Sequence, residues 1–327
     1  MATREASHAG DWYDSSKSKL NLHLDTYLNR VPEELVGLGE PAGEPVPVPV
    51  PGARAIIAPH AGYSYSGPAA AWAYKSIDWS QAKRVFLLGP SHHYHLSNCA
   101  LSQCAKYDTP LGALTLDRET IAELKQTGEF AAMKLDDDEA EHSLEMHLPY
   151  IYKMLKESHT GSSQMPPIVP ILIGSTSAAA EKKFGAILAP YLEDPANVFV
   201  ISSDFCHWGT RFRYTYYKPA SGPAKNLRSS DAPPVPHIHE SIAAVDRMCW
   251  EAVETGQHNA FLSVLEETGN TVCGRHPIGV MMAAVEEWRK NGEGRDGTFR
   301  FVRYERSSLV QNLQESSVSY CSAYAIL

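Results

Sequence analysis

The segment NVFVISSDFCHWG, residues 197–209, contains the pattern that decides the fold. A short, mostly apolar run is followed at once by polar side chains that include Asp204 and His207. Such a run is typical of a strand that is buried on both faces of a parallel sheet. Similar runs occur at residues 54–59, 84–89 and 168–174. The sequence therefore predicts a parallel sheet built around four strands.

Helical patterns separate these runs. Leucines recur at helical spacing in residues 16–31, and a second helix is predicted at residues 68–77 with Pro68 in its first turn. Further helices are predicted from the alanine-rich segment up to Leu192 and at residues 239–256, 261–268 and 278–290. Residues 298–305 and 316–326 alternate polar and apolar side chains, which favours antiparallel strands near the sheet edge. The predicted fold class is α/β, with a central, largely parallel sheet flanked by helices and with antiparallel edge strands.

Two stretches interrupt this order without dividing it. Residues 39–52 alternate valine and proline, and because proline lacks an amide hydrogen we expect an extended surface loop without ladder hydrogen bonds. Residues 218–236 are rich in proline, serine, alanine and glycine and are expected to form a second surface insertion. The acidic run at residues 136–141 is expected to be a solvated loop that enters a helix. We therefore predict a single domain over residues 1–327.

The composition limits the classes of partner. Hydrophobic residues make up 43% of the 327 residues and charged residues 20%, as in globular proteins with a buried core. The formal net charge of −9 repels phosphates, so we expect no nucleic-acid partner and no membrane insertion. The first residues predict no signal peptide, and the six cysteines form no CxxC pair. A cytoplasmic location is expected, with the nucleus as the alternative.

Three of the four apolar runs end in side chains that bind metals or transfer protons. His60 follows the first run, His92 and His93 follow the second, and Asp204 with His207 follow the fourth. A lone histidine is more often structural than functional. Because the carboxyl ends of parallel strands meet at one rim, however, we expect these side chains to surround a common pocket.

Cys273 lies in the segment NTVCGRHPIG, just before the helix predicted from residue 278. The approach to a helix, with Arg275 and His276 close by, is a position where a thiolate is favoured. A small buried hydrophobe is the equally good alternative. The residues alone do not decide between a metal ligand and a structural cysteine.

A second polar cluster lies in EHSLEMHLPY, residues 141–150. His142 and Glu145 are three residues apart and share a helix face, and His147 follows; the HExxH metalloprotease pattern is absent. These three side chains either support the site or form a structural network. Other residues near the candidate ligands are predicted to line the pocket wall: Trp12, Tyr63, Tyr65, His93, Cys206 and Arg275.

Long sequence blocks of this chain resemble the Memo family (mediator of cell motility), which is similar in fold to class III extradiol, non-haem iron dioxygenases. The blocks are REASHAGDWY, ARAIIAPHAGYSYSG, FLLGPSHH, EHSLEMHLPY, FVISSDFCHWGTRFRY, NTVCGRHPIGV and SSVSYCSAYA. The resemblance implies that His60, His92 and Cys273 are metal ligands. It further implies that Asp204 and His207 form an acid/base pair, with Asp204 orienting His207.

The resemblance also implies a function. A cysteine stands where the dioxygenases use a glutamate, and a soft sulfur ligand suits iron, copper or zinc. We expect iron (Fe²⁺) first, then copper, then zinc, in a redox protein with oxygen-linked chemistry and a role in cell motility, invasive growth or iron and redox homeostasis. Two alternatives remain: a non-catalytic module that binds a peptide or phosphopeptide of a signalling protein, and a zinc-dependent hydrolase. The small-molecule substrate is not indicated.

Overall fold

The four apolar runs are neighbouring parallel strands at the centre of the largest sheet. The computed structural model describes residues 2–39, 43–161, 164–231 and 235–327. The central strands run in the order β4-β11-β5-β10 and all pair in parallel. Their bounds are Ala53–Ala58 (β4), Asn197–Ser202 (β11), Arg84–Pro90 (β5) and Ile168–Ile173 (β10). Except for Arg84, every residue in them is buried, which confirms the prediction from continuous apolar runs.

Five further strands extend this sheet to nine, and their pairings are antiparallel except at the outer edge beyond β10, where the last pair is parallel. On the β4 side, β16 (Ser317–Ile326) pairs with β4, β15 (Phe299–Arg306) and β12 (His207–Trp208). On the other side, β6 (Cys99–Leu101) pairs with β10, and β9 (Phe130–Ala132) pairs with β6. The antiparallel prediction is confirmed for β15 and β16, but only β15 is an edge strand, because β16 lies between β15 and β4.

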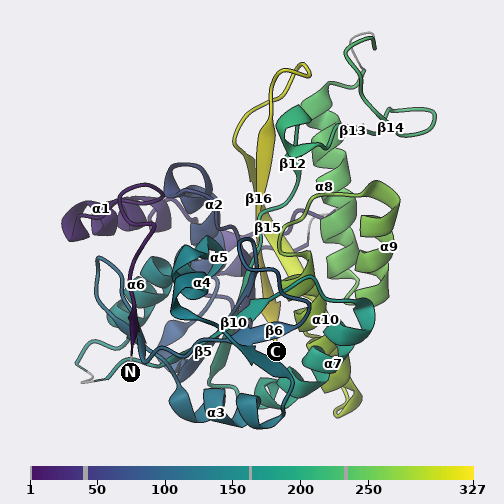
Figure 1. The fold of residues 1–327 in the computed structure, drawn as a ribbon. Helices are drawn as coiled ribbons and strands as arrows, with labels where there is room; N and C mark the ends of the chain where they lie inside the picture. Colours follow the sequence, from purple (N-terminus) through teal and green to yellow (C-terminus); the bar gives the residue numbers. More distant parts are fainter. Residues whose placement is uncertain (1, 40–42, 162–163, 232–234) are drawn as a thin grey trace.

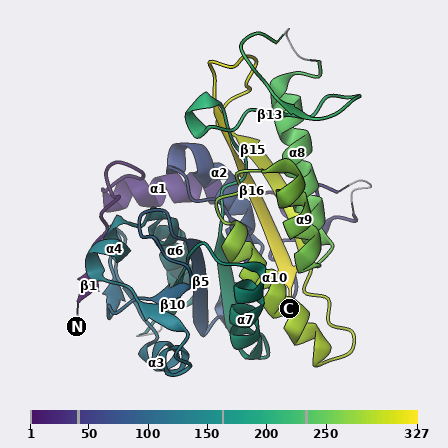
Figure 2. The ribbon, with the colours of Figure 1, turned by 45° about the vertical axis from the view of Figure 1, so that its right-hand side comes forward.

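Helices cover both faces of the sheet (Figures 1 and 2). On one side α2 packs on β16 and β4, with α1 and α6 against it; on the other, α10 packs on β11, β5 and α7. Bounds of the longer helices are Lys17–Leu28 (α1), Tyr63–Lys75 (α2), Arg118–Gln126 (α3), Leu148–Ser158 (α6), Ala178–Leu188 (α7), Ile238–Glu254 (α8), His258–Thr268 (α9) and Arg275–Lys290 (α10). The two short ones are α4 (Leu135–Ala140) and α5 (His142–Glu145).

Two helix predictions are corrected. Pro68 lies inside α2 and not in its first turn, because the helix already begins at Tyr63. The acidic run at residues 136–141 is not a solvated loop: it largely forms α4, and Asp138 is fully buried. Asp138 can be buried because a cation from elsewhere in the chain pairs with it: the guanidinium group of Arg4 lies 3.2 Å from its carboxylate. A buried carboxylate requires such a partner.

The valine-proline stretch does form a short ladder, contrary to prediction. Strand β3 (Val46–Pro47) pairs antiparallel with β2 (Glu34–Leu35), because valine amides on either side of Pro47 still donate hydrogen bonds. The amide of Val48, for example, donates to the Glu33 carbonyl at 2.9 Å. The part of this stretch at residues 40–42 lies outside the described residues.

The second predicted insertion contains β14 (Lys225–Asn226), which pairs with β13 (Tyr216–Tyr217). Residues 232–234 of this insertion lie outside the described residues. A third small sheet contains β1 (Thr3–Arg4), β7 (Lys106–Tyr107) and β8 (Leu114–Thr115). The main apolar core draws buried residues from Tyr13 to Ala325. No helix in the described ranges is long and apolar enough to cross a membrane.

Candidate metal centre

His60, His92 and Cys273 lie together at the carboxyl rim of the central strands. One donor atom from each residue lies within 4.8 Å of the other two, which is close enough for a single ion. His60 follows β4, His92 follows β5, and Cys273 ends the loop that leads into α10. The Sγ atom of Cys273 is 3.1 Å from Nε2 of His60. The imidazole rings of His60 and His92 meet edge to face, with their centroids 5.2 Å apart. This donor set fits a first-row transition metal.

His60 is held in the tautomer that a metal ligand needs. Its Nδ1 atom lies 2.6 Å from the hydroxyl of Ser202, and that hydroxyl donates its own hydrogen to the Ser143 carbonyl at 2.8 Å. Nδ1 must therefore carry a proton, and the lone pair is on Nε2, the atom that faces Cys273. Burial, and then the neighbouring charge of His92, lower the pKa of His60 well below its ordinary value, so the ring is neutral.

A carboxylate that the sequence reading did not single out orients His92. Glu141 accepts hydrogen bonds from the His92 backbone amide at 2.6 Å and from Nδ1 at 2.8 Å, which leaves Nε2 free for an ion. Burial alone would raise the pKa of Glu141, but the hydrogen bond and charge of His92 outweigh it and lower the pKa to about 2. The one available signal was the acidic residue directly before His142.

Asp204 forms hydrogen bonds with two of the candidate ligands, His60 and Cys273. Its backbone amide donates to Sγ of Cys273 at 3.2 Å, and its carboxylate accepts the His60 amide at 2.8 Å. Burial raises the pKa of Asp204 to about 7, against the effect of that hydrogen bond. Burial and the Asp204 charge likewise raise the pKa of the Cys273 thiol. A bound cation would reverse this by favouring the thiolate.

His207 is oriented by backbone groups and not by Asp204, so that expectation is corrected. The Nδ1 atom of His207 lies 2.8 Å from the carbonyl oxygen of Phe205 and 3.1 Å from that of Thr271. Both atoms only accept, so Nδ1 carries the hydrogen and Nε2 has the lone pair. Burial lowers the pKa of His207 despite these two hydrogen bonds. The Asp204 carboxylate is instead engaged with the amide of His60.

His142 and Trp12 form a ring wall beside the candidate ligands. The His142 ring stacks on the ring of His92, with the centroids 4.4 Å apart, and its centroid lies 5.4 Å from that of His60. The ring centroid of His142 also lies 4.4 Å from that of Trp12 and 5.8 Å from that of His93. Burial, followed by the charge of His92, lowers the pKa of His142 to about 3. These rings would exclude water from one side of a bound ion.

The other residues predicted for the pocket wall differ in their burial and in their partners. Tyr63 is buried and donates its hydroxyl to the Met146 carbonyl, whereas Tyr65 is 57% exposed. Cys206 packs with Trp208 in a separate core cluster. Among the described residues, Nε of Arg275 is buried without a hydrogen-bond partner.

Glu145 and His147 have polar partners other than the three candidate ligands. Glu145 binds the N-terminal segment through Arg4, His8 and Tyr13. The Nδ1 atom of His147 lies 2.7 Å from the hydroxyl of Tyr74 in the core. Both residues therefore support the surrounding structure, and their influence on a bound ion remains a prediction.

Replacing Glu141 with glutamine is expected to weaken metal binding about 10–100-fold, because His92 loses the carboxylate that fixes its ring and increases its basicity. Competition against a chelator of known affinity measures this change. The exposed Asp136, changed to asparagine, is the matched control. Equal affinities for Glu141→Gln and the control would show that Glu141 has only a structural role.

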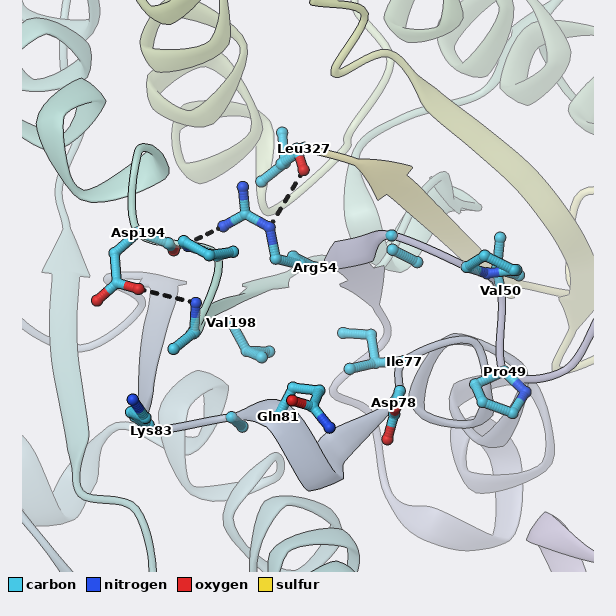
Figure 3. Close-up of a pocket in the computed structure, with 16 residues that line it drawn as sticks. Pro49, Val50, Arg54, Ile77, Asp78, Gln81, Lys83, Asp194, Val198 and Leu327 are labelled. Atoms are coloured by element: carbon cyan, nitrogen blue, oxygen red, sulfur yellow. Dashed lines mark hydrogen bonds between the residues drawn. The ribbon is translucent and has the colours of Figure 1, made fainter.

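A separate cleft of about 660 Å³ lies at the opposite, amino ends of β4, β5 and β11. Figure 3 shows Arg54 among the residues that line this cleft, with dashed lines to Leu327 and Asp194. Its guanidinium donates to the carbonyl oxygens of Leu327, Asp194, Leu192 and Asn197. Through these hydrogen bonds Arg54 connects β4 to β11 and to the end of β16. None of the candidate ligands lines this cleft.

The fold and the donor group together define an α/β protein with a His/His/Cys metal-type centre at the carboxyl rim of a largely parallel sheet. Comparison with known proteins gives the family. The family described as Memo-like protein matches residues 4–324, nearly the whole chain. The chain belongs to this family.

Curated relatives match nearly the whole length of this chain. Protein MEMO1 of Danio rerio is 45% identical over 327 residues, which cover 100% of this chain and 98% of that protein. Protein MEMO1 of Homo sapiens is 45% identical, and the match covers 98% of this chain and 97% of that protein. Protein memo-1 homolog of Caenorhabditis elegans is 42% identical, and the match covers 98% of this chain and 81% of that protein. The resemblance inferred from the sequence blocks is thereby confirmed.

Proposed function

We propose that this protein is a redox metalloprotein that binds one iron ion, with copper as the second choice, through His60, His92 and Cys273. The observation that carries the proposal is the convergence of the three donor atoms within 4.8 Å, with each histidine already oriented through Nδ1. Ligands that are oriented before the ion arrives lose little conformational freedom on binding it. Two nitrogens and one sulfur leave coordination positions open for other ligands.

Bound iron would supply redox chemistry with dioxygen; the chain supplies the surroundings. His207 is proposed as the proton donor and acceptor, acting through Nε2, with Nδ1 fixed by the carbonyls of Phe205 and Thr271. Asp204 is proposed to hold the His60 amide and the Cys273 sulfur in position. His142 and Trp12 exclude water from one side. The proposed physiological role is in cell motility, invasive growth or iron and redox homeostasis, in the cytoplasm or nucleus.

Metal analysis of the protein purified anaerobically from its native host tests this proposal. About one iron per chain is the expected result for a mononuclear group. Zinc in place of iron would favour a hydrolase in which His207 activates water. Protein without stoichiometric metal would overturn the redox proposal and favour a module that binds a peptide or phosphopeptide of a signalling protein beside Trp12 and the exposed Tyr65.

A further inference from the structure

The N-terminal segment brings an additional histidine to the wall of the candidate metal centre. The ring of His8 lies 6.0 Å from His142 and 5.7 Å from Trp12. His142 in turn stacks on His92. His8 is therefore one ring beyond the candidate ligands, too far for first-row metal bonds of about 2.0–2.1 Å.

Glu145 fixes the orientation of His8 with two hydrogen bonds. Its carboxylate accepts a hydrogen bond from the His8 backbone amide at 2.8 Å and another from Nδ1 of the ring at 2.8 Å. The same carboxylate binds the Arg4 guanidinium at 2.6 Å and the Tyr13 hydroxyl at 2.7 Å. These partners outweigh the effect of burial and lower the pKa of Glu145 to about 2, so it is an anion. An anion at Nδ1 places the neutral ring's lone pair on Nε2.

The Nε2 atom of His8 has no hydrogen-bond partner among the described residues. The side chain is 14% exposed, so solvent reaches part of it. The titratable groups that face the ring are Glu145 and His142.

We propose that His8 is a further proton-transfer residue of this centre, which accepts the proton of a hydroxyl or acid group on a molecule that binds the ion held by His60, His92 and Cys273. This inference rests on the proposed metal function. In the transfer, the O–H bond of the molecule breaks, its electron pair stays on oxygen, and the proton forms an N–H bond at Nε2. No electron is gained or lost. The anionic Glu145 stabilises the imidazolium that results.

The test uses the full chain loaded with cobalt(II) and acetohydroxamic acid as the probe, a protic ligand that binds metals as an anion. Titration calorimetry in buffers of different ionisation enthalpy counts the protons released to solvent. In His8→Asn the side-chain amide still donates to Glu145, as Nδ1 does, but no atom replaces Nε2. We expect the variant to release about one more proton per bound probe than the wild type, because metal ligands must be deprotonated. His23→Asn, on the exposed side of α1, is the matched control.

Equal proton release by wild type and His8→Asn, with an intact thiolate-to-cobalt absorption band, would overturn the role of His8 alone. An increase seen in His207→Gln but not in His8→Asn would assign the proton to His207 and overturn it equally. A wild type without the thiolate-to-cobalt band would overturn the metal proposal, and this inference with it. Absence of any probe-induced spectral change in the loaded wild type would also count against His8.

Discussion

Cys273→Ser is expected to abolish stoichiometric metal binding while leaving the metal-free protein almost as stable as the wild type. Serine retains an atom that accepts the Asp204 amide, which donates to Sγ at 3.2 Å, but it does not form a thiolate. Loss of a second-sphere partner alone lowers metal affinity about 10–100-fold, so loss of the sulfur ligand is expected to exceed about 100-fold. In chelator the variant should lie within about 1 kcal/mol of wild type.

The alternative for Cys273, a packed hydrophobe, makes the opposite prediction. All six cysteines are described, and the other five are buried whereas Cys273 is partly exposed. Cys321→Ser, in the buried strand β16, is therefore the matched control: it should destabilise the fold with or without metal. Melting temperatures in chelator and in excess metal separate the two, because only the loaded wild type gains stability from bound metal. Full metal retention by Cys273→Ser would show that a carboxylate, such as that of Asp204, is the third ligand.

His60 behaves differently from Cys273 in such an experiment. From the sequence we expect all three ligands to lie at a rim, so that their removal costs little stability. His60 is only 2% exposed, however, and its Nδ1 hydrogen occupies the hydroxyl of Ser202. His60→Ala would therefore create a cavity and leave a buried hydroxyl with one partner fewer. Cys273 is the better position at which to separate metal binding from folding.

The central strands and two of the three candidate ligands, His60 and His92, could be predicted because their signals are local. A continuous apolar run that ends in a polar residue identifies both a buried parallel strand and the rim at which its last side chains meet. His60, His92 and Asp204 each follow directly from that pattern. Cys273 has no strand in front of it, and only the resemblance to the Memo family assigned it to the group.

The residues that orient these ligands could not be predicted, because their contacts join distant parts of the chain. Glu141 binds His92 across 49 residues, and Glu145 binds His8 across 137. Neither spacing is repeated in the sequence, so no periodicity reveals it. Burial of Asp138 depends in the same way on Arg4, 134 residues away, and a local reading of the acidic run therefore favoured a solvated loop.

Arg4→Met is expected to destabilise the protein by about 3–5 kcal/mol at neutral pH, the cost of leaving buried carboxylates without their cation. Arg4 is fully buried and contacts both Asp138 and Glu145, and its guanidinium also donates to the carbonyl oxygen of Glu141. Methionine fills a similar apolar volume, so the loss reports on charge and hydrogen bonding more than on packing. Urea unfolding measures the deficit, and Lys290→Met, which removes an exposed pair with Glu287, is the control and should leave the stability nearly unchanged.

The deficit of Arg4→Met should narrow as the pH falls. Partners including Arg4 lower the pKa of Glu145 from 4.5 to about 2, a difference worth about 3 kcal/mol that is fully present above pH 4.5 and is lost as the pH falls towards 2. Without Arg4, one of the partners that lower the pKa of Glu145 is lost, so the carboxylate takes up a proton at a higher pH in the variant than in the wild type. Asp138 adds to this effect, because burial already raises its pKa in the wild type and Arg4 opposes that rise. Unfolding free energies at pH 7 and at about pH 4, inside that window, test the sign. A deficit that does not narrow on acidification would show that Arg4 stabilises the fold through packing and not through its charge.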